Sequence, residues 1–129
     1  MSQVVNTLAR WIVKNGMACF DRSMLSDEMN SRILSEAGAM FFNLGKIAEA
    51  IDAFSIANNN AMLLWAGDKL MDANRFREAA KAYIPTKDRE KLDKAASVCM
   101  QAGDYKLALQ AYEASGNIEM ANFVRNNAY

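Results

Sequence analysis

A pattern that returns every 29 residues limits the folds open to this chain more than any other feature of the sequence. Small and aromatic residues keep their register from one copy of the pattern to the next. The aligned positions are Ala50, Ala79 and Ala108; Ala53, Ala82 and Ala111; and Phe54, Tyr83 and Tyr112. Self-similarity at such a period is typical of repeat architectures, in which each unit buries its apolar face against its neighbour.

Residues that end and begin helices recur at the same spacing. The residues Gly45, Asn74 and Gly103 align, and both types tolerate the left-handed conformation that closes a helix. A second set has side chains that can cap a helix N-terminus, and its members are Asn30, Asn59, Asp88 and Asn117. Each unit is therefore predicted to hold a cap, a helix of about 13 residues, a tight turn, a second helix of about 11 residues and a short loop.

The spacing of the apolar residues predicts an all-α fold. Leu63, Ala66 and Leu70 stand at helical intervals, and the sequence shows no sustained alternation of the kind that marks strands. We expect a right-handed antiparallel helix-hairpin solenoid that occupies 1–129 as a single domain. Its parts are a degenerate first unit at 2–28, clear units at 30–58, 59–87 and 88–116, and a capping helix at 117–129.

The composition argues against several classes of function. The 15 Lys and Arg residues equal the 15 Asp and Glu residues, so the chain lacks the cationic surplus of a nucleic-acid backbone binder. With no histidine in the sequence, His-based catalytic triads and His metal sites are excluded. No phosphate-binding loop, nucleophile elbow or calcium loop occurs. We therefore expect no enzyme, no metal and no cofactor.

The two cysteines and the N-terminus favour a protein of a reducing compartment. Cys19 and Cys99 lie 80 residues apart without a CxxC partner, so we expect both to be small apolar core residues. The first residues lack the charged-then-apolar order of a signal peptide, and no apolar run approaches the length of a membrane span. We expect a cytoplasmic protein.

The repeated pattern resembles the tetratricopeptide repeat. In the unit 30–58 the matching residues are Leu34, Ala37, Gly38, Phe41, Gly45, Ala50, Phe54 and Ala57. The family's unit is longer, at about 34 residues, and shorter units of this kind are similar to the helical solenoids of vesicle-coat, clathrin-like and ciliary-transport subunits. The family's carboxylate clamp is not matched, because its positions here hold residues such as Ala39, Leu64 and Asp68.

The resemblance implies that the first helix of each unit lines a concave face. That places Val13, Phe42, Met71 and Met100 in one row, with Leu64 and Trp65 close to it and a polar rim of Arg10, Asp68, Asp72, Asp93 and Gln101. Such a row would suit a partner peptide or helix. We expect a non-catalytic scaffold or adaptor that binds protein partners and no nucleic acid, with its oligomeric state left open.

Two other readings remain open. The chain could be a fragment or small subunit of a larger trafficking solenoid, which an unsatisfied apolar surface formed by Val4, Val5, Trp11 and Ile12 would favour. It could instead be an RNA-binding helical-repeat module, for which the basic residues Arg75, Arg77, Lys81 and Lys87 are the candidates. The scaffold alone does not decide between these functions, because function depends on the site.

Overall fold

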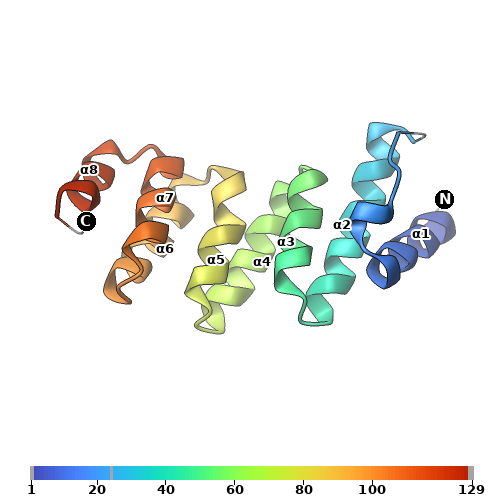
Figure 1. The fold of residues 1–129 in the computed structure, drawn as a ribbon, viewed down its shortest axis with the longest axis horizontal. Helices are drawn as coiled ribbons and strands as arrows, with labels where there is room; N and C mark the ends of the chain where they lie inside the picture. Colours follow the sequence, from blue (N-terminus) through green and yellow to red (C-terminus); the bar gives the residue numbers. More distant parts are fainter. Residues whose placement is uncertain (1, 24, 128–129) are drawn as a thin grey trace. The chain divides into compact units, whose positions relative to one another are not determined.

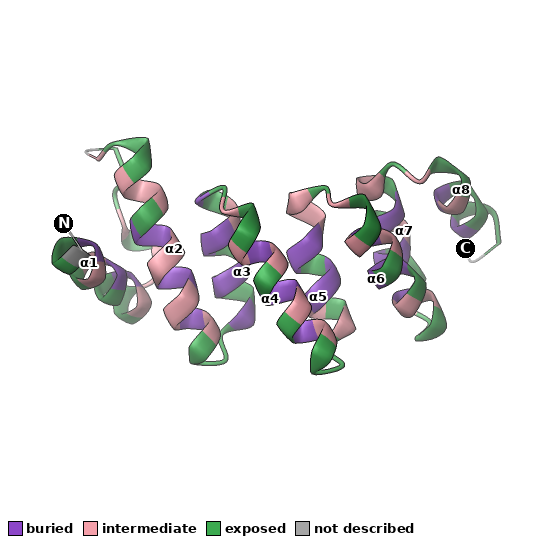
Figure 2. Ribbon diagram, turned by 180° about the vertical axis from the view of Figure 1, so that it is seen from behind, coloured by how far each residue is buried: buried purple, intermediate pink, exposed green. Residues whose placement is uncertain are grey.

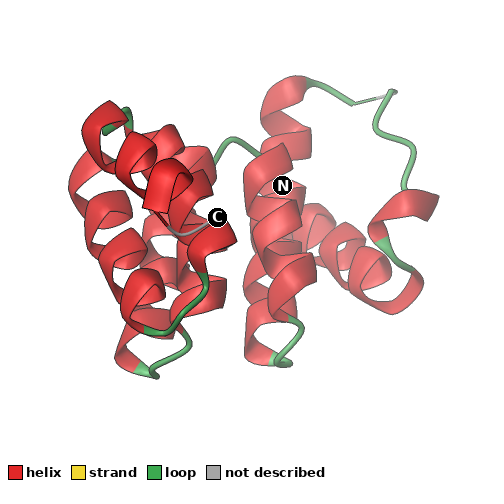
Figure 3. Cartoon of the chain, turned by 60° about the vertical axis from the view of Figure 1, so that its left-hand side comes forward, coloured by secondary structure: helices red, strands yellow, loops and turns green. Residues whose placement is uncertain are grey.

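The computed structural model describes residues 2–23 and 25–127, and all regular secondary structure in these ranges is helical (Figure 3). The predicted all-α class is thereby confirmed. Eight α-helices occur there: α1 (Ser2–Asn15), α2 (Asp27–Asn43), α3 (Ile47–Ile56), α4 (Asn60–Asp72), α5 (Phe76–Tyr83), α6 (Arg89–Gln101), α7 (Tyr105–Ser115) and α8 (Ile118–Asn127). Two short 3-10 helices, Met17–Cys19 and Ile84–Thr86, complete the regular structure of these ranges.

The chain divides into two compact units, Met1–Met62 and Leu63–Tyr129. The first holds α1, α2 and α3, and the second holds most of α4 together with α5 to α8 (Figure 1). In both, the helices bury one face and leave the opposite face to solvent (Figure 2). This is the pattern expected of amphipathic helices that pack in pairs.

In the first unit, α2 packs against both α1 and α3. Ile12, Ile33 and Phe54 are fully buried there. The Phe54 ring of α3 lies directly on the backbone of α2 at Gly38, where an added Cβ atom would sit 2.6 Å from Phe54 Cε1. A glycine at position 38 is therefore what lets the two helices approach so closely.

The second unit repeats this close approach. The Tyr83 ring of α5 lies on α4 at Gly67, where an added Cβ atom would come within 2.7 Å of Tyr83 Cδ1. Further along, α6 packs on α7 and α7 packs on α8. Ala121 and Val124 are the buried residues of α8.

The turn inside each hairpin has the same geometry. Gly45, Asn74 and Gly103 have φ values of 80°, 61° and 83°, which confirms the predicted left-handed conformation. In each turn the following amide reaches back to the carbonyl five residues earlier. These bonds are Lys46 N to Phe41 O at 2.9 Å, Arg75 N to Leu70 O at 2.8 Å, and Asp104 N to Cys99 O at 2.9 Å. This is the Schellman pattern that satisfies the last carbonyls of a helix.

A second left-handed residue follows α3, α5 and α7. Asn58, Lys87 and Gly116 have φ values of 55°, 59° and 79°. At Lys87 this feature could not be predicted from the sequence, because a lysine carries a Cβ atom and is uncommon in this conformation. The loop around Lys87 also closes differently from the loop around Gly116. In both loops a hydroxyl, that of Thr86 or of Ser115, donates to the carbonyl three residues earlier and accepts from the amide two residues later. The amide of Asn117 reaches Tyr112 O as well, at 3.0 Å, whereas the amide of Asp88 bonds the Thr86 hydroxyl at 3.2 Å.

Three of the four predicted N-caps are confirmed. The side chains of Asn59, Asp88 and Asn117 accept hydrogen bonds of 3.1 to 3.2 Å from the amide three residues later. Each of these helices therefore begins where the 29-residue spacing placed it.

The prediction that Asn30 caps a helix is wrong. Asn30 lies inside α2, which begins at Asp27 because Ser26 is the cap, with its hydroxyl accepting from Met29 N at 3.1 Å. The acidic pair Asp27 and Glu28 in the first turn favours this earlier start by complementing the helix dipole. The side chain of Asn30 instead donates to Arg22 O at 3.0 Å.

The segment after α1 departs from the hairpin pattern. Among the described residues between Asn15 and Asp27, only Met17–Cys19 are helical, as one short 3-10 turn with no buried residue. The prediction that Cys19 belongs to the core is therefore wrong: this turn does not pack inward, and Cys19 is exposed. The same prediction for Cys99 is confirmed, because this residue is buried in α6.

Candidate functional site

The eleven predicted groove residues are divided between the two units, and each set is described within its own unit. The first unit holds Arg10, Val13 and Phe42. The second holds Leu64, Trp65, Asp68, Met71, Asp72, Asp93, Met100 and Gln101.

An apolar hollow of about 380 Å³ lies between α1 and α2 in the first unit. We call it the α1–α2 hollow, and its lining residues are Arg10, Val13, Lys14, Met40, Asn43 and Leu44. Val13 and Met40 are half-buried, and Leu44 is 62% exposed at the end of α2. The hollow brings together Arg10 and Val13 from the predicted set, but Phe42, which is half-buried, is not part of its lining.

Two cations flank the hollow, and none of the described residues that line it is acidic. Arg10 and Lys14 are both exposed and stand one helical turn apart on α1. Within the described ranges, neither forms an ion pair. Glu36, which shares a neighbouring hollow with Arg10, accepts a hydrogen bond of 2.8 Å from Asn6 Nδ2. An asparagine amide is neutral, so Glu36 still offsets part of this charge, and the two cations leave a net positive charge beside the α1–α2 hollow.

A second, polar pocket of about 330 Å³ lies among α4, α5 and α6. We call it the α4–α6 pocket. Three predicted residues of α4 meet there, namely Asp68, Met71 and Asp72. The other lining residues are Tyr83, Glu90, Lys91 and Lys94. Of these, the sequence analysis placed none in a groove.

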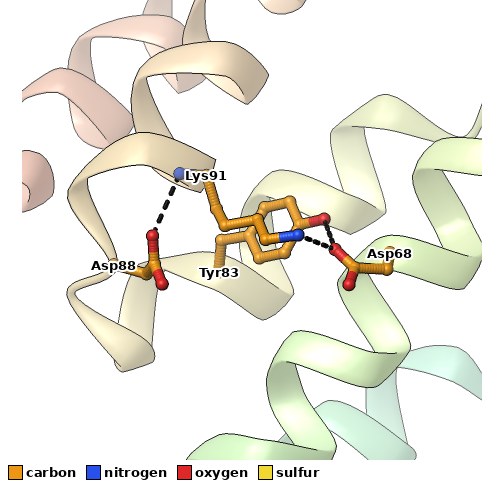
Figure 4. A network of polar contacts seen from close by, with 4 residues as sticks. All are labelled: Asp68, Tyr83, Asp88 and Lys91. Carbon is orange, nitrogen blue, oxygen red and sulfur yellow. Dashed lines mark hydrogen bonds and ion pairs between the residues drawn. The ribbon is translucent and has the colours of Figure 1, made fainter.

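Asp68 is the centre of this pocket. Its Oδ1 atom accepts hydrogen bonds from the Tyr83 hydroxyl at 2.6 Å and from Lys91 Nζ at 2.8 Å (Figure 4). Three helices are thereby joined by one carboxylate. The backbone amide of Lys91 is in turn capped by Asp88, which fixes the start of α6.

The ionisation of the three side chains follows from these contacts. Partial burial acts to raise the pKa of Asp68, but the hydrogen bonds from Lys91 and Tyr83 outweigh it and leave the pKa below its ordinary value. The hydrogen bond to Asp68 raises the pKa of Lys91, and burial together with Asp68 raises the pKa of Tyr83. At neutral pH the group is thus a carboxylate, an ammonium and a phenol, an arrangement that holds helices together rather than exchanging protons.

The remaining predicted residues of the second unit have varied surroundings. Trp65 is 37% exposed, with Lys69 Nζ 6.0 Å from its ring centroid, a cation–π distance. Asp93 accepts a hydrogen bond of 2.7 Å from the Ser115 hydroxyl, so this rim residue has a partner in the chain itself. Leu64 and Met100 are half-buried, whereas Gln101 is exposed.

The Asp68–Tyr83 pair has one signal in the sequence. The positions 29 residues before and after Asp68 hold Ala39 and Ser97, so Asp68 is the one carboxylate of its aligned set, whereas a tyrosine recurs as Tyr112. The α1–α2 hollow left a weaker signal. Leu44 is an apolar residue placed directly before the turn glycine, where exposure is expected.

No three His, Cys, Asp or Glu side chains gather into a metal site within residues 2–23 and 25–127. The helices in those ranges are also too short or too polar to cross a bilayer. Comparisons of the chain with protein-family models, with curated proteins and with solved structures give no match.

Proposed function

We propose that this protein is a non-catalytic interaction module that binds other proteins through the surfaces of its helical hairpins. In this proposal it is a right-handed solenoid of four 29-residue units and a capping helix. The recurring turns support the repeat: left-handed residues stand 29 apart at Gly45, Asn74 and Gly103, and again after the second helix of each hairpin. Arrays of this kind offer extended binding surfaces.

The observation that carries the binding function is the α1–α2 hollow. Val13, Met40 and Leu44 present apolar surface there, beside two cations without ion pairs in the described ranges. An apolar side chain of a partner could cover this surface, and each Å² of apolar area that it removes from water stabilises the complex by about 25 cal/mol. A groove of apolar residues with polar edges is the usual form of a helix-binding or peptide-binding surface.

The concave row of Phe42, Met71 and Met100 stays a prediction within this proposal. Its test is quantitative co-purification from cell extract, with wild type compared with Phe42→Glu and Met71→Glu. We expect a bound partner to be lost by at least about tenfold, or roughly 1.4 kcal/mol, while circular dichroism stays helical. Ile118→Glu is the matched control, because it places the same charge on an apolar residue of α8 that is 72% exposed.

Either of two results would contradict the prediction that these residues form a partner-binding row. Unfolding of both variants would mean that these side chains belong to the core. Normal folding with unchanged partner recovery would mean that the partner binds elsewhere.

A second candidate function is that of a subunit in a larger helical assembly. Val4 and Trp11 are 51% and 43% exposed on α1, whereas their neighbours Val5 and Ile12 are buried. The two exposed side chains stand seven residues apart, hence on one side of the helix, where a further helix could pack. Sedimentation of wild type against Trp11→Ser, each mixed with candidate subunits, would test this function.

A further inference from the structure

We infer that the α1–α2 hollow binds an acidic amphipathic helix. The inference rests on the proposed protein-binding function and names the class of partner. It depends on the apolar lining of the hollow, on the two cations beside it, and on which backbone conformation of a partner can bind to the side of a helix.

The apolar lining indicates an apolar anchor on the partner. Val13 and Met40 are half-buried at the hollow, and Leu44 is 62% exposed at its edge. Methionine is flexible and adapts its shape to different side chains, so the hollow can accept a leucine, a methionine or an aromatic ring. At about 380 Å³ the hollow has room for one or two such side chains.

The charges indicate an acidic partner. Arg10 and Lys14 stand at i and i+4 on α1, so their side chains emerge about 5–6 Å apart at the Cβ atoms. Both are exposed and without ion pairs in the described part of the chain. Two carboxylates one turn apart on a partner helix would match this spacing.

The backbone of the partner decides between a helix and an extended strand. The hollow lies near the C-terminal ends of two helices, where the backbone N–H groups are already paired within each helix and only the last carbonyls are not. An extended peptide would find no backbone N–H groups there for its own carbonyls, whereas a helix satisfies its own backbone groups. The partner is therefore helical when bound.

The test uses three synthetic peptides of about 16 residues, long enough to form a helix on binding. The acidic peptide carries a leucine face flanked by glutamates. The basic peptide has lysine in place of each glutamate, and the polar peptide has serine in place of each leucine. Binding to the full chain is measured by fluorescence anisotropy, at low salt and again at high salt.

We expect the acidic peptide to bind at least tenfold more tightly than either of the others, and its affinity to fall as salt rises. Arg10→Glu and Lys14→Glu should each weaken the acidic peptide by about tenfold. Arg32→Glu is the matched control, because Arg32 is an exposed arginine of α2 outside the hollow, and it should leave the affinity nearly unchanged. Circular dichroism confirms that each variant is folded.

Three results would overturn the inference. The first is equal or tighter binding of the basic peptide; if Leu44→Glu then abolishes that binding, the hollow still binds protein and only the acidic class is wrong. The second is the same loss of affinity for Arg10→Glu and Arg32→Glu, and the third is no binding of any peptide. Recovery of a protein partner by wild type in the co-purification judges the proposed function separately.

Discussion

Replacing Gly38 with alanine tests the close packing of α3 against α2. The new methyl carbon would lie 2.6 and 2.7 Å from Phe54 Cε1 and Cδ1, about 1 Å inside the optimal separation of two carbon atoms. Phe54 is fully buried, so its ring cannot move into solvent and the two helices must separate. Overpacking of this kind costs about 1–3 kcal/mol, whereas alanine gains about 1 kcal/mol over glycine inside a helix. We expect a net destabilisation on the order of 1 kcal/mol.

Introducing Gly38→Ala into a Phe54→Leu variant separates the cost of overpacking from the gain in helix propensity. In Phe54→Leu the ring atoms are gone, so Gly38→Ala should stabilise the protein by up to about 1 kcal/mol. Urea unfolding followed by Trp11 fluorescence, with Trp65 replaced by phenylalanine, reports on the first unit. If Gly38→Ala raised the free energy of unfolding equally in both backgrounds, the close approach of Phe54 to Gly38 would be refuted.

Four shorter predictions concern single side chains. A thiol reagent at neutral pH should label one cysteine per folded chain, because Cys19 is exposed whereas burial raises the pKa of Cys99 to about 11; mass spectrometry of Cys19→Ser should show no label until unfolding. Tyr83→Phe removes the hydroxyl bond to Asp68 and should lower the free energy of unfolding by about 0.5–1.5 kcal/mol, while the exposed Tyr105→Phe should change it little. Because the pKa of Asp68 is lowered in the folded state, its carboxylate stabilises the protein above about pH 4 and loses that effect as pH falls through the folded pKa. Asp68→Asn should therefore lower the free energy of unfolding by about 1 kcal/mol or less at neutral pH, because the Asp68–Lys91 pair is partly exposed. This difference from wild type should shrink in acid, and a difference that grew would contradict the stabilising role of the Asp68 carboxylate. Ala79→Leu should cost about 1–3 kcal/mol in thermal or urea unfolding because Ala79 is fully buried, whereas Ala48→Leu at an exposed site should be nearly neutral.

The helix order and most helix boundaries could be predicted because turns and caps depend on local chemistry. A left-handed residue such as Gly45 or a capping side chain such as Asp88 acts within a few residues of its own position. Local chemistry also explains the error at Asn30, since Ser26 is an equally good cap and is followed by acidic residues.

The candidate sites could be predicted only in part, because they depend on how helices are rotated against one another. The resemblance placed Arg10 and Val13 near each other on α1, and both line the hollow, but it did not show that Leu44 would reach the same hollow from α2. In the same way, Lys91 lies 23 residues after Asp68 in the sequence. Only the packing of the helices brings Lys91 Nζ within 2.8 Å of Asp68 Oδ1. Apolar spacing reports which side of a helix is buried and does not report the angle at which its neighbour crosses.

The loop around Lys87 has a consequence for the slow motions of the second unit. Lysine in the left-handed conformation is disfavoured by roughly 1–2 kcal/mol, and Lys87 N lies 3.4 Å from Ile84 O, compared with 3.2 Å for the corresponding bond of Gly116. The amide of Asp88 bonds the Thr86 hydroxyl, whereas the amide of Asn117 bonds both the Ser115 hydroxyl and Tyr112 O. Local opening should therefore require less free energy here than at Gly116, and the amide protons of Lys87 and Asp88 should exchange with deuterated solvent before those of Gly116 and Asn117.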